Sequence, residues 1–507
     1  MAEKKMKKIR QPKPDTPALS ALKFFPLLVF ALLIIVGGLE LVTAAAVSVF
    51  VALAVAMYTT GRDYNTLYHT GLDAAARIIE VYFIVQFANA LAECFMATGV
   101  GAAVINIALQ LGVTARSVGI IALVVTCVLS VATGTSWGTF AACAPIFLWL
   151  NYIIGGNMIL TIGACAGGAC FGDNIGVISD TTVLSCGMQD VKIIDRVKHQ
   201  LGWSGLCLVA SSIIIYMLSL NLTNTAGNVR EAFSSIPEET FEVLAEERPA
   251  ALALLQQVQN GVPYYMVIPL ILVIVIAFMG VSTLMTLGTG MVACLIFGYI
   301  AGTCDISTWL NDLVTGGMSA SGGSNVIMMM WVSMFGGLMN SMNAFEPLSK
   351  LIIRISKNVN QLMSWCGVLC MIGNAALADE ACEIATISPI VRNIVEENVE
   401  TADEESMYRL RTRLATYTDA LGVMGSELIP WHCYIVFFCT IASSVFPLHV
   451  FTPGDLIKGN IMSFVMVGSM LVLSFTGLDR FIPGFALPGK DKAWLKKRDT
   501  DAEAASA

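Results

Sequence analysis

The sequence predicts an all-α polytopic membrane protein built from two inverted repeats, with broken helices or re-entrant hairpins in each. Of the 507 residues, 56% are hydrophobic and 13% are charged, whereas soluble chains carry about 25% charged residues. The apolar stretches are long and unbroken rather than alternating, which disfavours a membrane β-barrel. This composition excludes soluble enzymes, nucleic-acid-binding proteins and secreted disulfide scaffolds.

The apolar segments fall into two groups that are separated by a polar stretch. Several are shorter than the ~20 residues that a straight span needs, and several contain glycine. Short, glycine-interrupted segments in both halves are typical of broken helices at a transport site. The segments lie at residues 21–38, 41–58, 75–97, 99–112, 117–132, 135–150, 156–172 and 204–221, and then at 263–280, 283–303, 327–343, 345–356, 360–376, 431–449 and 459–477.

Two pairs of short motifs indicate that the halves are repeats. Asp173–Ile178 resembles Asp419–Met424 at an offset of 246 residues, and Ala144–Ile146 resembles Ser388–Ile390 at an offset of 244. Each match is short, but the nearly equal offsets predict an internal repeat.

Lysine and arginine predict the topology, because cytoplasmic loops carry an excess of them. We expect a cytoplasmic basic tail at 1–20, a first transmembrane repeat at 21–221, an external acidic loop at 222–262, a second repeat at 263–477 and a cytoplasmic tail at 478–507. Both termini would then be cytoplasmic and the repeats inverted, in a multi-pass protein of the cell (inner) membrane. The alternative is an unrelated helical bundle with a chance distribution of charge.

The first candidate site is the polar run Thr133–Thr139 inside an apolar segment. Thr135, Ser136 and Thr139 supply hydroxyl groups, and an unwound helix would add carbonyl oxygens. Neutral oxygen ligands suit a dehydrated alkali cation or a small polar solute. The alternative is helix packing, with the hydroxyl groups bonded back to the helix.

The second candidate site follows a glycine-rich stretch and contains two carboxylates. Asp173 and Asp180 are seven residues apart, a spacing that on one helix places them on the same face. Ser179 and Thr181 flank Asp180. Charged residues at membrane depth are costly and usually line a pathway. The alternative is a loop at the membrane edge whose aspartates cap the next helix.

The third candidate site lies in the second half, at the places that match the first two. Asp379, Glu380 and Glu383 correspond to the hydroxyl-rich run, and Asp419 and Glu427 correspond to the Asp173 region. Hydroxyl groups of one half would then face carboxylates of the other. The alternative is that Glu380 and Glu383 are solvated near a cytoplasmic end.

No resident cofactor is expected. The 14 cysteines form no Cys-x-x-Cys pair and the four histidines are scattered, so the sequence indicates no zinc, haem or iron–sulfur site. The complete P-loop motif, Gly-x-x-x-x-Gly-Lys-Ser/Thr, is also absent from the sequence, and we expect a transporter rather than an enzyme.

These motifs resemble those of the NhaC family of Na+/H+ antiporters. The resemblance covers about 300 residues in the expected order: Thr-Gly-Thr-Ser-Trp-Gly-Thr at 133–139, Phe-Gly-Asp at 171–173, Ser-Asp-Thr-Thr at 179–182, Ala-Asp-Glu at 378–380 and Leu-Ile-Pro-Trp at 428–431. This chain departs from the family pattern at Asn174, where many members have Lys, at His432, where Asn is usual, and at Glu427, where a neutral residue is usual. The resemblance implies an exchanger in which a transport domain moves against a scaffold, often as a homodimer.

We therefore expect a secondary transporter in which Na+ and H+ compete for Asp173 and Asp180, with Asp379 as a further candidate carboxylate of the site. Thr135, Ser136, Thr139 and Thr181 would supply neutral oxygens. The partners would be Na+, protons and the lipid bilayer, with no nucleic acid. An alternative is an exchanger or symporter of a small organic solute, such as a carboxylate or amino acid. An intramembrane aspartyl protease is disfavoured, because Cys170 stands where its Gly-x-Gly-Asp motif needs Gly.

Overall fold

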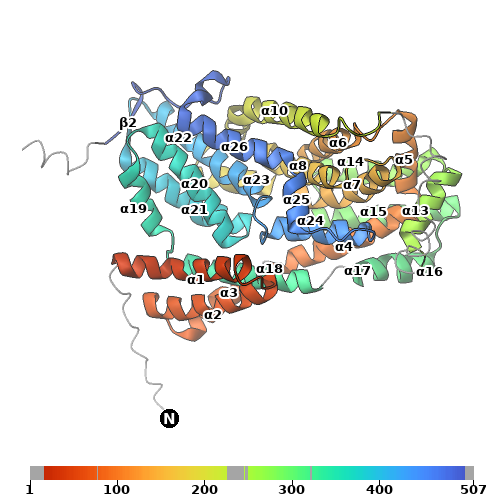
Figure 1. Cartoon of the computed structure of the whole chain (residues 1–507), viewed down its shortest axis with the longest axis horizontal. Helices are drawn as coiled ribbons and strands as arrows, with labels where there is room; N and C mark the ends of the chain where they lie inside the picture. Colours follow the sequence, from red (N-terminus) through yellow and green to blue (C-terminus); the bar gives the residue numbers. More distant parts are fainter. Residues whose placement is uncertain are drawn as a thin grey trace, which may run out of the picture.

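The computed structural model describes residues 16–76, 78–177, 179–224, 245, 249–319 and 323–496. The described chain is almost entirely helical (Figure 1), and its two short strands, β1 (Val399–Thr401) and β2 (Ala493–Leu495), pair antiparallel. This agrees with the all-α prediction.

The first half contributes helices that follow one another through short turns. They are α1 (Pro17–Ile35), α2 (Leu41–Thr60), α3 (Tyr64–Ala76), α4 (Ile78–Thr98), α5 (Val100–Gln110), α6 (Val118–Thr133), α7 (Ser136–Ile153), α8 (Met158–Ile175), α9 (Asp180–Gln189) and α10 (Ile193–Leu218). Most of the stretch expected as an external loop lies outside the described residues, but its last part forms the helix α13 (Pro249–Asn260).

The second half is more interrupted. It contains η1 (Tyr264–Val267), α14 (Ile268–Phe278), α15 (Thr283–Ala301), α16 (Ile306–Thr308), η2 (Trp309–Thr315), α17 (Gly316–Ser319), α18 (Gly323–Ser341), α19 (Glu346–Ile355), α20 (Val359–Leu377), α21 (Glu380–Asn398), α22 (Glu404–Thr416), η3 (Tyr417–Leu421), α23 (Gly422–Ser426), α24 (Cys433–Val445), α25 (Pro453–Gly459), α26 (Ile461–Thr476) and η4 (Leu478–Phe481). Of these, η2 and η3 are π-helices, which are rare and frequently found at functional sites.

Several described helices are long and apolar enough to cross a membrane. Four qualify alone, and two bent pairs bring the number to six if each pair is one span. The pairs are α4 with α5, bent by 65°, and α25 with α26, bent by 66°. The expectation of short or broken apolar helices is thus met in both halves of the described chain.

The helices pack in two layers. α1, α2, α3 and α18 lie together along one side of the molecule, and the remaining helices form a thicker body (Figure 1). In that body α8 is buried along most of its length, with α6, α7, α25 and α26 around it. Its glycines allow this, because a Cβ at Gly163 would lie only 2.0 Å from the carbonyl carbon of Gly459. α8 therefore fits directly against the bend between α25 and α26.

Two helix breaks stand at equivalent places in the two halves. α6 ends at Gly134 in the left-handed conformation and α7 begins after an extended Thr135; α20 ends at left-handed Ala378 and α21 begins after an extended Asp379. Both following helices contain a proline at their tenth position. The offset between the breaks is the 244 residues found in the sequence, which supports an internal repeat.

Candidate functional site

Asp173 lies near the C-terminal end of α8 and is buried. The backbone N–H of Ser136, the first residue of α7, donates to both of its carboxylate oxygens at 3.1 Å, and the hydroxyl of Tyr434 donates to one of them at 3.2 Å. The carboxylate thus occupies the N-terminal end of α7, where the helix dipole favours negative charge. These donors stabilise the ionised form without cancelling its charge.

The three predicted hydroxyl ligands around this helix start differ in what they contact. The Thr139 hydroxyl donates to the carbonyl of Thr135 at 2.8 Å, as the packing alternative expected. The Ser136 hydroxyl is buried and has no hydrogen-bond partner among the described residues. Thr135 is half-buried, and with Thr139 it also lines a narrow cleft against α14 and α15. The structure thus brings the backbone N–H of Ser136 to Asp173.

The placement of Asp173 and Asp180 on one helix face is wrong. α8 ends at Ile175, extended Gly176 follows, and a separate helix, α9, begins at Asp180. The helical periodicity is broken between the two aspartates, so their spacing of seven does not align them. The side chain of Asp180 lies outside the described residues. Beside it, the hydroxyl groups of Ser179 and Thr181 are buried and lie 3.0 Å apart.

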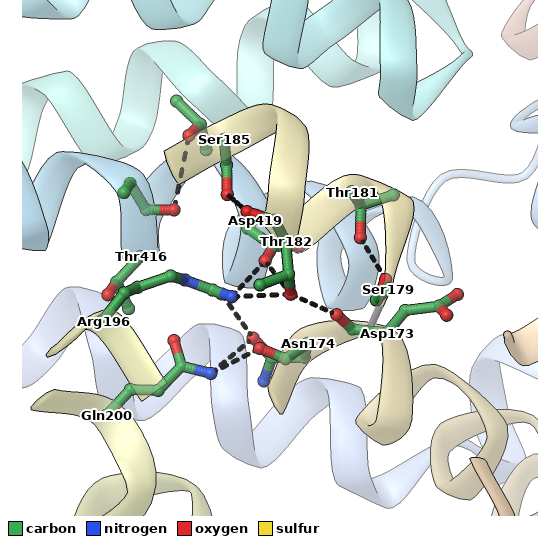
Figure 2. Close-up of polar contacts among 12 residues, drawn as sticks. Asp173, Asn174, Ser179, Thr181, Thr182, Ser185, Arg196, Gln200, Thr416 and Asp419 are labelled. Atoms are coloured by element: carbon green, nitrogen blue, oxygen red, sulfur yellow. Dashed lines mark hydrogen bonds and ion pairs between the residues drawn. The ribbon is translucent and has the colours of Figure 1, made fainter. Parts of the chain in front are cut away.

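Asp419 lies in the π-helix η3 and forms a buried ion pair that the sequence did not suggest. Its Oδ2 is 2.5 Å from Nη1 of Arg196 on α10, and both side chains are fully buried. Figure 2 shows the Arg196 side chain reaching across to Asp419 and Thr182, while the Asp173 carboxylate points away from this pair. Asp173 and Asp419 match in sequence but have different partners.

Thr182 connects the two aspartates. Its hydroxyl lies 2.9 Å from the carbonyl oxygen of Asp173 and 3.0 Å from Oδ2 of Asp419 (Figure 2). On the same side, the Gln200 amide donates to the backbone and side-chain oxygens of Asn174. The predicted Asp173 and Asp419 regions are thus brought together, with α10 supplying residues that sequence reasoning missed. Arg196 had a weak signal, since it is a charged residue at the start of an apolar helix.

The acidic residues of the second break have divided roles. Asp379 caps α21, and its Oδ1 accepts from the backbone N–H of Cys382 at 2.8 Å. Glu380 and Glu383 are buried, and a Cβ at Gly422 would lie 3.4 Å from an oxygen of each. The alternative, in which they are solvated, is wrong. Neither Glu383 oxygen accepts a hydrogen bond from a nitrogen or oxygen donor among the described residues.

Glu427 follows α23 and is fully buried between α8 and α26. One of its oxygens accepts from the Cys170 thiol of α8 at 3.0 Å. The other accepts from the Ser463 hydroxyl at 3.0 Å and from the side-chain amide of Asn460. Glu427, which departs from the family pattern, is therefore hydrogen-bonded within a buried polar network. We call this network the polar centre, and it comprises Asp173, Thr182, Arg196, Glu380, Glu383, Asp419 and Glu427.

The polar centre is formed where helices break, and it combines side chains from both halves of the chain. Ionisable residues inside membrane proteins usually mark substrate or ion pathways. Within the described residues, no group of three or more His, Cys, Asp or Glu side chains is arranged to hold a metal ion. Fold and site together define a multi-pass membrane transporter.

Comparison with known proteins identifies the family to which this transporter belongs. The model of the Na+/H+ antiporter family matches residues 11–186 and 168–454, so the chain belongs to the Na+/H+ antiporter family. This confirms the NhaC-type resemblance that the motifs indicated. The family consists of transporters rather than enzymes.

Individual relatives match over shorter stretches. The NhaC Na+/H+ antiporter of Alkalihalophilus pseudofirmus is 22% identical over 40% of either chain, and the malate-2H+/Na+-lactate antiporter of Bacillus subtilis is 29% identical over 33% of this chain and 36% of its own length. An uncharacterised Na+/H+ antiporter of Haemophilus influenzae is 31% identical over 21% of this chain and 23% of its own. The matched segments thus span less than half of each relative.

Proposed function

We propose that the protein is a secondary active transporter that exchanges Na+ for H+ across the cell membrane, with both cations competing for the Asp173 carboxylate. The observation that carries this proposal is the placement of that carboxylate at the N-terminal end of α7. The backbone amide and the Tyr434 hydroxyl support the ionised form, which Na+ requires. Burial supports the protonated form, so either cation gives a neutral site.

This competition couples the two fluxes. An empty, charged site is costly to move through the membrane, so the site crosses only when it holds Na+ or H+. Neutral oxygen ligands would come from Thr135 and Ser136 at the start of α7, and from Ser179 and Thr181 at the start of α9. Asp180 stays a proposed ligand, because it is the first residue of α9 and stands between Ser179 and Thr181. Asp379 is better explained as a helix cap.

Asp173→Asn tests the assignment in purified protein reconstituted into liposomes that contain a fluorescent pH reporter. An imposed Na+ gradient should drive proton movement through the wild type, K+ should not, and the variant should lose at least ~99% of the flux. Asp403→Asn is the matched control, because Asp403 is an exposed cap of α22 and asparagine caps equally well. Full exchange in a well-folded Asp173→Asn protein would contradict the proposal.

A second candidate function is exchange of a small organic acid on the same fold. It is favoured by the B. subtilis relative, whose name describes malate and lactate as its substrates. The liposome assay separates the two candidates, because protein that binds Na+ but moves no protons with Na+ alone would favour the organic-acid exchanger. Radiolabelled malate, lactate and amino acids would then identify the solute.

We further propose that the repeats are inverted, that both termini are cytoplasmic and that the body around α8 moves as a transport domain in a homodimer. The matching breaks at Gly134 and Ala378 support the repeat. Labelling a cysteine placed in each basic tail, from either side of a sealed vesicle, tests the orientation.

A further inference from the structure

Four of the buried carboxyl groups in the polar centre have distinct surroundings. Asp419 is paired with Arg196, which keeps it ionised. Glu383 is fully buried and accepts no hydrogen bond from a nitrogen or oxygen donor among the described residues, a setting that disfavours a charge. Asp173 and Glu427 instead accept hydrogen bonds from neutral groups. Such an environment tolerates both the ionised and the protonated form.

Three donors from two helices support the ionised form of Glu427. The Cys170 thiol approaches from α8, and the Ser463 hydroxyl and the Asn460 amide approach from the start of α26. No described cation forms an ion pair with Glu427. Three hydrogen bonds offset much of the cost of burying the charge, but no counter-charge makes that charge permanent.

The protonated form of Glu427 is also accommodated. A carboxylic acid has one O–H to donate, and a serine hydroxyl can accept a hydrogen bond as well as donate one. Ser463 can therefore reverse its role by rotating its hydroxyl group. Burial removes water from the carboxyl group and favours this neutral form. Neither state leaves Glu427 without a hydrogen-bond partner.

Glu427 is also connected to the proposed Na+ site. Cys170, which donates to Glu427, precedes Asp173 by one helical turn on α8. On the other side, Asn460 stands at the 66° bend between α25 and α26, which α8 touches through its glycines. The Cys170 side chain therefore joins Glu427 to the helix that carries Asp173.

We propose that Glu427 is a second proton-binding site of the exchanger, which takes up and releases one proton in each cycle in addition to the proton exchanged at Asp173. The proton leaves to the aqueous phase that the site faces when Na+ binds, and the carboxylate is then held by Cys170, Asn460 and Ser463. This inference rests on the proposed function. Its consequence is that more than one proton moves per Na+, so that exchange depends on the membrane potential.

The decisive experiment measures proton release when Na+ is added to purified protein in weakly buffered detergent. The wild type should release more than one proton per bound Na+, and Glu427→Gln should release one fewer. Glu383→Gln is the matched control, with the same substitution at an equally buried position, and should release as many protons as the wild type. In liposomes, imposing a membrane potential should alter the Na+-driven proton flux of the wild type but not that of Glu427→Gln.

Unchanged proton release in Glu427→Gln overturns the inference, as does a wild type that releases a single proton. If Glu427→Gln does not fold, Ser463→Ala provides the test, because it removes one donor and leaves the carboxyl group in place. It should release fewer protons than the wild type near neutral pH, and equal release would again overturn the inference. Loss of Na+ binding in Asp173→Asn is a separate readout, so failure of the second site and failure of the proposed function are distinguishable.

Discussion

The two helix breaks have the same backbone but different chemistry. Thr135, in the first break, has φ −146° and ψ 126°, and Asp379, in the second, has φ −145° and ψ 125°. In the first break, the helix start accepts a carboxylate from elsewhere in the chain, Asp173. In the second, the helix start is capped by its own Asp379.

The two aspartates that match in sequence, Asp173 and Asp419, have correspondingly different partners. Because α21 has its own cap, Asp419 does not occupy the start of that helix, and it pairs with Arg196 instead. Asp173 keeps its place at the start of α7, with neutral donors around it. Two helix breaks with the same backbone can therefore lie beside carboxylates in different settings, one paired with an arginine and the other held by a backbone N–H and a tyrosine hydroxyl.

The largest expected effect comes from removing the positive charge of Arg196, which pairs with Asp419. Arg196→Gln leaves Asp419 buried without its counter-ion, and breaking a buried pair costs about 3–5 kcal/mol. The variant should melt well below the wild type in detergent, as measured by intrinsic tryptophan fluorescence.

A double variant sharpens this test. Arg196→Gln combined with Asp419→Asn removes both charges, so it should recover much of the stability that either single variant loses. Additive losses would show that the two side chains do not act as a pair. If the double variant still exchanges Na+ for H+, transport requires no charge at Asp419. The comparison of the two breaks predicts this result.

The next largest effect tests the first break directly. Ser136→Pro removes the backbone N–H that donates to Asp173, while proline is well tolerated at the first residue of a helix. The extended Thr135 before it already has the conformation that precedes proline. A hydrogen bond to a charged group contributes about 1.5–3 kcal/mol, so Na+ affinity should fall roughly 10- to 100-fold.

The comparison variant is Ser136→Ala, which keeps the N–H and removes the hydroxyl group. It should lose far less Na+ affinity in a binding titration than Ser136→Pro. Equal losses would mean that the hydroxyl group, and not the helix start, holds the cation site.

Local sequence patterns predicted much of this molecule. Composition predicted the helical membrane fold, glycines and short apolar runs predicted broken helices, and equal offsets predicted the matching breaks. The Thr-Ser run and Asp173 were expected in the same site, and the structure brings Ser136 into contact with Asp173. These features are encoded within single segments, so they can be read without knowing how segments pack.

The remainder depends on contacts between distant segments. Arg196 reaches Asp419 and Tyr434 reaches Asp173 across more than 200 residues of sequence, and no local pattern marks either contact. The error over Asp173 and Asp180 arose from extending helical periodicity through Gly176, where α8 ends. Burial of Glu380 and Glu383 was equally hidden, because an acidic stretch has the same composition whether it is solvated or enclosed.

The smallest expected effect concerns the backbone that the breaks share. Left-handed geometry costs a residue with a side chain roughly 1 kcal/mol, and the first break uses Gly134 at φ +68° whereas the second uses Ala378 at φ +52°. Ala378→Gly should relieve that strain and change stability by less than about 1 kcal/mol, because glycine also gains freedom in the unfolded chain. Gly134→Ala should introduce the strain and lower the melting temperature by a few degrees at most. If Ala378→Gly raises stability and Gly134→Ala lowers it, both breaks need the same left-handed backbone. A large loss of stability in Ala378→Gly would mean that the alanine methyl group makes a contact that the first break lacks.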